Sequence, residues 1–338
     1  MMGRFIFRRA LLAVPTLVGL TIVTFFVSHL LPADMVLVNL GDQAVRSPEL
    51  VAAFKHRWGL DRPLLTQYLV YGGNLLHGNL GTSIATHRPV LAELALSLPA
   101  TMELATVAMA GAVAAGVVLG VLAAVLRDSK VDIFARGLSA VGVAIPTFWF
   151  AILLLALVYF QLGWAPPPGR LSAGIVPPEP ITGMYLVDSL LRGQVDVLVD
   201  ALRHLVLPAI VIATVCLGYV TRITRASMIE ALAEDYVRTA SAKGLTPWAV
   251  IVRHALRNSL IPVITIGGTL YAQVMSGTVM AETIYSWPGI GRYAFTSAGS
   301  MDFPAVMGVA LVVGAVYVAV DLCVDVLVVW ANPRVRYR

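Results

Sequence analysis

Two aspartates, Asp321 and Asp325, stand four residues apart in an apolar stretch near the end of the chain. Residues four apart share one face of a helix, so the pair could relay a proton across a membrane. The alternative is that both pair with cationic or hydroxyl groups of neighbouring helices near the membrane boundary. We favour this alternative because one apolar turn separates the pair from Trp330 and Arg334.

The lysines bear on whether the chain itself hydrolyses ATP. The phosphate-binding loop of an ATPase needs a lysine directly after a glycine. The three lysines, Lys55, Lys130 and Lys243, follow a phenylalanine, a serine and an alanine. The chain therefore lacks such a loop, and we predict that it has no catalytic residues and no cofactor of its own.

The remaining reactive side chains do not form a catalytic or metal-binding pattern. His56, His77 and His87 lack the spacing of metal ligands, so we predict no metal site. Ser276 could serve an intramembrane protease, but no histidine lies in a position to activate it. A proton-coupled carrier should have ionisable residues at mid-membrane in both halves, whereas such carboxylates occur only in the last apolar stretch, so it remains a remote alternative.

The composition predicts an all-α, polytopic membrane protein. Of the 338 residues, 58% are hydrophobic and 13% are charged, which excludes an ordinary soluble domain. Six apolar stretches are long enough to cross about 30 Å of hydrocarbon. These predicted spans are Ala10–Leu31, Leu104–Leu126, Gly137–Leu162, Leu198–Val220, Ser259–Ala281 and Pro304–Trp330.

The distribution of basic residues predicts the topology. The N-terminus, residues 127–136, residues 222–257 and the C-terminal tail together hold about 15 of the 24 Lys and Arg residues, which indicates that they are cytoplasmic. The net charge of +5 follows from this topology and does not indicate nucleic-acid binding. We therefore expect a cytoplasmic N-terminus (1–9), a first span (10–31), an extracytoplasmic region (32–98) and a five-span domain (99–338), with both termini inside.

The cytoplasmic loop 225–262 has the pattern of a helix, a turn and a second helix. Gly244 offers a left-handed cap for the first helix, and Thr246 followed by Pro247 offers the start of the second. A compact helical pair is more than a connection requires, which favours a docking surface. The alternative is an amphipathic segment held by anionic membrane lipid.

Two segments of this loop, DYVRTASAKGL and RHALRNSLIP, resemble the cytoplasmic loop of the ABC-transporter permeases that import dipeptides, oligopeptides or nickel. These permeases belong to the binding-protein-dependent permease superfamily. Arg238, Thr239 and Ala240 stand where the superfamily has Glu-Ala-Ala, a departure from the general pattern. WGLDRPLLTQYLVYGGNLLHGNLGTS and ETIYSWPGIGRYAF are similar to other segments of the same family.

The resemblance implies a role for the helix at residues 236–243. Such a helix would sit in a groove of an ATPase subunit and pass its motion to the spans. On this reading Leu232, Tyr236 and Ala240 lie along one side of the helix. The predicted coupling residues are Glu234, Asp235, Tyr236, Arg238, Thr239, Ala240, Lys243 and Gly244.

The resemblance also implies partners and a location. We expect a second homologous permease subunit, two ATP-binding subunits that hold ATP and magnesium, and an extracytoplasmic substrate-binding protein, all at a bacterial cytoplasmic (inner) membrane. The cargo would be di- or oligopeptides, with nickel, glutathione or another small solute as alternatives. The sequence names no substrate-binding residue. In the outer region, Pro48–Trp58 and Leu64–Leu76 are predicted to be short helices.

Overall fold

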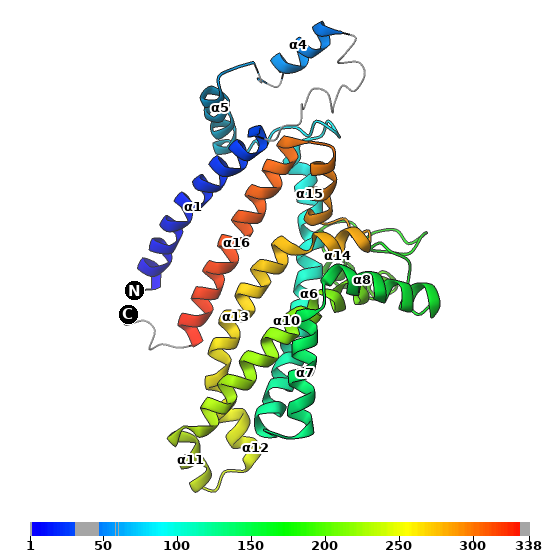
Figure 1. Cartoon of the computed structure of the whole chain (residues 1–338). Helices are drawn as coiled ribbons and strands as arrows, with labels where there is room; N and C mark the ends of the chain where they lie inside the picture. The colour runs from blue at the N-terminus through cyan, green and yellow to red at the C-terminus, as the bar shows by residue number, and fades with distance from the viewer. Residues whose placement is uncertain (1, 31–46, 58, 60, 332–338) are drawn as a thin grey trace.

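A computed structural model describes residues 2–30, 47–57, 59 and 61–331, and most of these residues are helical. Long helices run side by side in Figure 1: α1 (Met2–Leu30), α6 (Val90–Val125), α10 (Val195–Ala233), α13 (Leu256–Gly277) and α16 (Phe303–Ala331). The short helices α11 and α12 lie at one end of this frame. Helices α4 and α5 lie at the other end (Figure 1). The all-α prediction is therefore confirmed.

Helix length and apolarity identify the membrane-crossing segments. Within the described residues, four helices are long and apolar enough to cross a bilayer: Val90–Val125, Val195–Ala233, Pro247–Ser276 and Phe303–Val328. A fifth crossing is possible if the bent pair Lys130–Ala144 and Thr147–Gln161 forms one span. The first predicted span lies in α1, where the described apolar helix is the shorter Leu11–Phe26.

The third predicted span is broken. Its residues fall in α7 (Lys130–Ala144), α8 (Thr147–Leu154) and the π-helix η1 (Leu155–Gln161), and the two halves meet at 102°. Pro146 cannot continue a helix, and the residue before it, Ile145, is extended with ψ 127°. Most of residues 137–162 are helical, but they do not form the single straight crossing that their apolar length predicted.

Small residues bring the long helices into close contact. A Cβ on Gly120 of α6 would lie 2.5 Å from Cβ of Thr224 on α10, and one on Gly116 would lie 2.7 Å from Val220. Such close contact explains why α6 and α10 form the most extensive helix pair of the molecule. The glycines thus act in helix packing.

The two short helices predicted after the first span are present in the structure. α4 (Pro48–Arg57) and α5 (Leu64–Leu76) occupy the predicted runs, while Trp58 lies outside the described residues. α5 rests on the end of α1 through Tyr68, whose hydroxyl lies 2.9 Å from Thr21 Oγ1. The ring of Phe25 packs 5.3 Å from that of Tyr68 and 5.9 Å from that of Tyr71. These contacts attach α5 to the helical frame.

Candidate functional site

The predicted coupling loop is a compact helical unit between two long helices. It consists of α11 (Asp235–Ala242), α12 (Pro247–Ala249) and the π-helix η2 (Val250–Ala255), followed directly by α13. Glu234 separates α10 from α11 because its backbone is extended, with ψ 149°. The unit therefore sits at the tip of α10 and α13, at the far end from α4 and α5 (Figure 1).

Local sequence signals form the turn of this unit. Gly244 has φ +79°, the left-handed conformation that glycine adopts without strain. Thr246 Oγ1 accepts a hydrogen bond from the Ala249 N–H at 3.4 Å, and Pro247 occupies the first turn of the second helix. The predicted helix caps are confirmed.

One face of α11 is packed against the frame. Val237 and Ala240 are 6% and 5% exposed, and they join a buried cluster with Met228 and Ala231 of α10 and Ala124 of α6. Val250 and Ala255 of η2 complete the cluster. Ser259 Oγ donates a 2.9 Å hydrogen bond to Sδ of Met228 and so ties α13 to α10. A force on α11 would therefore reach α6, α10 and α13 directly.

The opposite face of α11 is exposed and charged. Asp235 and Arg238 have side chains 95% and 76% exposed, with Arg238 Nη1 3.4 Å from Asp235 Oδ1. Tyr236 is 36% exposed beside these charges, although it lies one turn before the buried Ala240 on the same side of α11. The break at Glu234 separates α11 from the helical phase of Leu232. The predicted site residues that are exposed are Glu234, Asp235, Tyr236, Arg238, Thr239, Lys243 and Gly244, and Ala240 is buried.

Two apolar side chains that the sequence analysis did not select also lie on this surface. Trp248 is 71% exposed and Leu245 is 42% exposed, both in or beside the turn. Exposed aromatic residues amid polar neighbours are typical anchors of protein interfaces. The position of Trp248 directly after a helix-starting proline was the available signal.

A partly buried ion pair fixes α7 to α10 close to this unit. Arg225 donates from Nε and Nη2 to the two oxygens of Asp132, at 2.6 and 2.7 Å. These bonds lower the pKa of Asp132 to about 2, against the opposing effect of burial, and raise the pKa of Arg225. Asp132 also accepts from the backbone N–H of Asp128 at 3.1 Å. The pair therefore holds residues 127–136, the turn that the sequence predicts to be cytoplasmic, to α10.

The paired aspartates of the last helix lie against α1. Arg9 Nε is 3.0 Å from Asp325 Oδ2, and Arg9 Nη1 is 3.7 Å from Asp321 Oδ2. Arg9 and Asp325 are 316 positions apart in the sequence. A cationic partner is what the favoured alternative expected, and an arginine that stays protonated makes a poor member of a proton relay.

A buried carboxylate that the sequence analysis missed organises the loop around α14 (Val279–Ile284). Glu282 accepts from Thr101 Oγ1 and Thr278 Oγ1, both at 2.7 Å, and from the Arg292 backbone N–H at 2.9 Å. Thr101 Oγ1 in turn accepts from the N–H of Ile290, which begins α15 (Ile290–Gly299), at 2.8 Å. The glutamate is fully buried, and its hydrogen bonds hold α6, α14 and α15 together.

A second missed pair lies close by. Arg170 Nη2 is 2.6 Å from Glu103 Oε2, with both side chains buried. The guanidinium also covers the Tyr185 ring at 3.5 Å and lies 5.4 Å from the Trp287 ring. Glu103 Oε1 accepts from the Leu186 N–H at 2.6 Å. This pair fastens the proline-rich segment before α9 (Tyr185–Leu191) onto α6.

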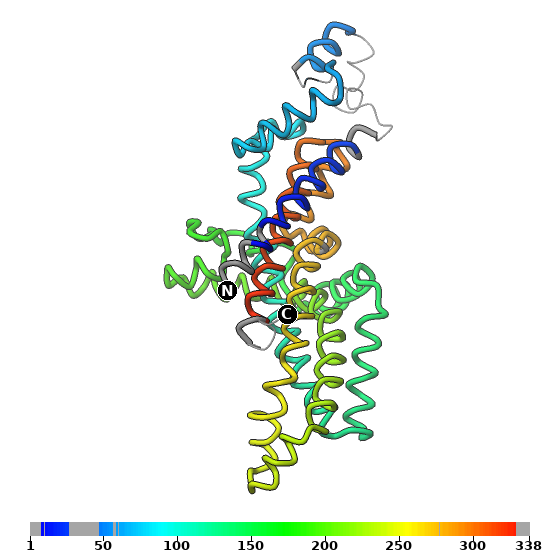
Figure 2. Tube along the Cα trace, turned by 90° about the vertical axis from the view of Figure 1, so that its left-hand side faces the viewer, coloured from blue at the N-terminus to red at the C-terminus, as the bar shows by residue number. Residues whose placement is uncertain are grey.

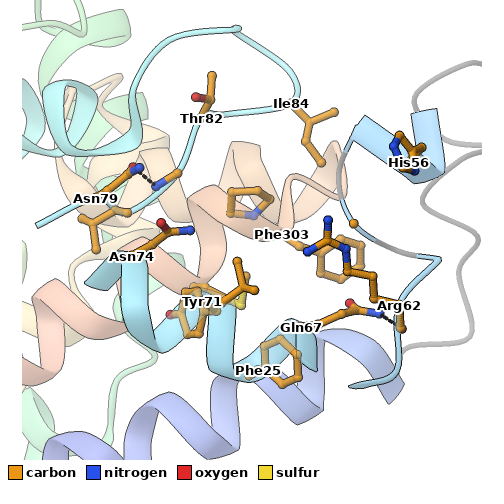
Figure 3. Close-up of a pocket in the computed structure, with 16 residues that line it drawn as sticks. Phe25, His56, Arg62, Gln67, Tyr71, Asn74, Asn79, Thr82, Ile84 and Phe303 are labelled. Carbon is orange, nitrogen blue, oxygen red and sulfur yellow. Dashed lines mark hydrogen bonds between the residues drawn. The ribbon is translucent and has the colours of Figure 1, made fainter. Parts of the chain in front are cut away.

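Two cavities lie away from the coupling unit. One, of about 450 Å³, opens between α5, the end of α1 and the start of α16, and Figure 3 shows Tyr71, Asn74 and Phe303 on its walls. Gln67 donates to the Arg62 carbonyl at 2.7 Å on its edge. The other, of about 200 Å³, lies on α10 and α13 and includes Tyr219 and Gln273. It borders the apolar centre of both helices.

Two protein-family models match most of the chain. The family model described as "Binding-protein-dependent transport system inner membrane component" matches residues 116–337. A second model, "Binding-prot-dependent transport system membrane comp, N-term", matches residues 2–105. Together these matches include α1, both ends of α6, α10 and the coupling unit.

Curated relatives match over nearly the whole chain. The chain is 44% identical over 334 residues to the "Di/tripeptide transport system permease protein DppB" of Pseudomonas aeruginosa, covering 99% of both proteins. It is 44% identical over 317 residues to the "Probable D,D-dipeptide transport system permease protein DdpB" of Escherichia coli K12, covering 94% of this chain and 93% of that protein. It is 41% identical over 339 residues to the "Dipeptide transport system permease protein DppB" of the same strain, covering all of both.

Proposed function

We propose that the chain imports di- or oligopeptides, because it belongs to the family of binding-protein-dependent transport system inner membrane components. It is thus the non-catalytic permease subunit of an ABC system with ATPase and binding-protein partners. The family binds no cofactor itself. The relatives named for dipeptide or di/tripeptide transport, matched from end to end, support this cargo. Nickel, glutathione or another small solute would be the cargo if peptide uptake proves independent of the chain.

The proposed topology has six crossings with both termini in the cytoplasm. The first crossing is residues 10–31, which begin in α1 and end at Leu31, outside the described residues, and the broken α7–α8 pair counts as the third. Residues 32–98 are extracytoplasmic, residues 99–338 form the five-span domain and the loop 225–262 is cytoplasmic. The separation of α11 from α4 and α5, at opposite ends of the long helices, supports this orientation (Figure 2). The basic segments at the α11 end support it as well.

The exposed face of α11 is the observation that carries the coupling proposal. Two ATPase subunits would dock on two such units, one here and one on a second homologous permease that forms the other half of the path. Asp235, Arg238 and Lys243 would orient α11 by charge, while Tyr236 and Trp248 would fill pockets of the ATPase. Closure of the ATPases on nucleotide would then move α11 as a rigid body.

Transport rescue tests the assignment. Cells lacking this chain would receive wild type, Gly244→Pro or Lys130→Ala, with the membrane level of each checked, and uptake of a labelled peptide panel would be measured. Proline fixes φ near about −65°, which the left-handed Gly244 cannot adopt without rebuilding the turn. We expect rescue by wild type and by Lys130→Ala, an exposed cytoplasmic control outside the coupling unit, and none by Gly244→Pro.

Each failure has a separate meaning. If wild type does not restore peptide uptake, the cargo proposal fails while the permease family stands. If Gly244→Pro restores full uptake at normal membrane level, the coupling role of α11 fails while the cargo proposal stands.

A further inference from the structure

A groove of about 500 Å³ runs between α7 and α10, apart from the coupling unit and both cavities described above. Its walls combine basic and small apolar side chains. The lining residues that matter are Arg136, Ala140, Ala144, Thr221, Arg222 and Arg225.

The crossing of α7 over α10 creates this groove. A Cβ on Gly218 would lie 2.7 Å from the Ser139 carbonyl oxygen, and a Cβ on Gly142 would lie 2.7 Å from that of Thr214. The two backbones therefore touch. Ala140 and Ala144 are too small to fill the space beside this contact, which leaves the groove open along the outer face of both helices.

The basic end of the groove carries more positive than negative charge. Asp132 is shared, since its Oδ1 lies 2.6 Å from Arg225 Nε and 3.5 Å from Arg136 Nε. Arg222 has no ion pair within the described part of the chain and instead lies over the Tyr219 ring at 5.3 Å. Asp128 also interacts electrostatically with Arg225, so three arginines face two carboxylates, and an anion in the groove would find an excess of guanidinium donors.

A buried hydroxyl points to an absent partner in the same place. Thr221 is 2% exposed, lines the groove, and its Oγ1 has no hydrogen-bond partner in the described structure. A buried polar group without a partner costs free energy, so native proteins rarely leave one unpaired. The Oγ1 atom lies just beneath the groove surface, so a change of the Thr221 side-chain rotamer would bring the hydroxyl to an oxygen-bearing ligand in the groove.

The groove is basic at one end and apolar at the other, and this change falls at the predicted edge of the membrane. Arg136, Arg222 and Arg225 lie just outside the predicted spans 137–162 and 198–220. Ala140, Ala144 and the apolar wall lie inside them. A ligand that fits would have an anionic end at the membrane surface and an apolar end in the hydrocarbon, which is the build of an anionic phospholipid.

We propose that this groove binds one anionic phospholipid of the cytoplasmic leaflet. The phosphate lies between Arg136 and Arg222, Thr221 donates to a headgroup or ester oxygen, and an acyl chain follows Ala140 and Ala144. Arg225 remains engaged with Asp132 and contributes charge at longer range. The site rests on the proposed orientation of the chain and is independent of the cargo.

Lipid retention by the purified, delipidated transporter tests this site. Phosphatidylglycerol or phosphatidylcholine would be added back, and bound lipid counted by native mass spectrometry for wild type, Arg222→Gln and Arg253→Gln. Arg253 is a matched control because it is an exposed arginine of η2, away from the groove. One arginine near the surface contributes about 1 kcal/mol, so we expect Arg222→Gln to lower phosphatidylglycerol retention about fivefold and Arg253→Gln to leave it unchanged.

A second variant tests the groove by shape instead of charge. Ala140→Trp should fill the apolar half and lower retention of both lipids, with every arginine in place. Equal retention of phosphatidylglycerol by wild type, Arg222→Gln and Ala140→Trp overturns the proposal. Cross-linking of Ala144→Cys to a second permease chain, in a background without Cys216 and Cys323, also overturns it, because a protein then occupies the groove.

Discussion

In the coupling unit the charged side chains of Asp235 and Arg238 project away from the protein, whereas around α14 the charged groups of Glu103, Arg170 and Glu282 are buried. The exposed charges contact each other once, at 3.4 Å. The two buried carboxylates, Glu103 and Glu282, each accept at least two hydrogen bonds of 2.6 to 2.7 Å, one of them from Arg170. One region offers its charges to a partner, and the other uses them to fix loops on the frame.

The difference concerns what removal of a charge would do. An exposed ion pair contributes about 0–1 kcal/mol to stability, so its loss should be felt mainly in binding. Removing one member of a buried pair strands the other and costs about 3–5 kcal/mol. Mutations can therefore separate the two regions by the quantity they change, and the following predictions run from the largest effect to the smallest.

Arg170→Met should be the most damaging of these changes. It leaves Glu103 buried without its cation, and we expect the free energy of unfolding to fall by about 3–5 kcal/mol. Thermal unfolding of the detergent-purified protein measures this loss. The double variant Glu103→Leu with Arg170→Met should recover part of it; recovery of nothing would mean that Arg170 acts mainly through the Tyr185 ring.

Glu282→Gln should have the next largest effect. The amide keeps one acceptor oxygen but replaces the other with a donor that faces the Arg292 N–H or the threonine hydroxyls. We expect a loss of about 1–3 kcal/mol in the same measurement. Glu179→Gln, an exposed acid on the same side of the frame, is the control and should change stability by less than about 0.5 kcal/mol. Equal effects of the two variants would contradict the role of Glu282 in holding α6, α14 and α15 together.

The double variant Tyr236→Ala with Trp248→Ala should show the opposite behaviour. Both side chains are exposed, so unfolding should change by less than about 0.5 kcal/mol. Loss of two interface anchors should weaken ATPase docking at least tenfold, or about 1.4 kcal/mol. Binding of the ATPase subunit to the reconstituted permease, together with the unfolding midpoint, checks both halves. A stability loss as large as that of Arg170→Met would erase the contrast between the two regions.

The smallest expected effect is a response to acid at the base of the coupling unit. The pKa of Asp132 falls from 3.8 to about 2 in the folded protein, so its stabilising contribution is complete above about pH 5. That contribution is lost progressively as the pH drops from about 5 towards 2. Asp132→Asn should remove this part of the pH dependence, measured as the unfolding midpoint between pH 5 and 3. An unchanged slope in the variant would assign the acid sensitivity to other groups.

Local signals predicted the coupling unit well. The cap at Gly244 and the start at Thr246 and Pro247 depend on residues within one turn of each other, which a sequence displays directly. The positions of α4 and α5 were predicted for the same reason. The role of α11 in coupling remains a prediction.

Tertiary contacts explain what the sequence did not predict. The partner of Asp325 is 316 residues away, and Glu282 meets Thr101 only after α6 and α14 pack together. Leu232 does not continue the row formed by Tyr236 and Ala240, because the predicted periodicity assumes an unbroken helix, whereas Glu234 interrupts it. Apolar length alone also hid the bend at Pro146, since a window of hydropathy averages over a proline.

α10 is one continuous helix of 39 residues, with Pro208 inside it and the coupling unit attached to its last turn. At 1.5 Å per residue it is a rod of about 58 Å. A tilt of only about 10° about one end would displace the other end by about 10 Å, by the geometry of a rigid rod of that length. Such leverage means that a small, stiff movement at the ATPase would suffice to part or close a passage on the opposite side of the bilayer, without any bond in between having to break.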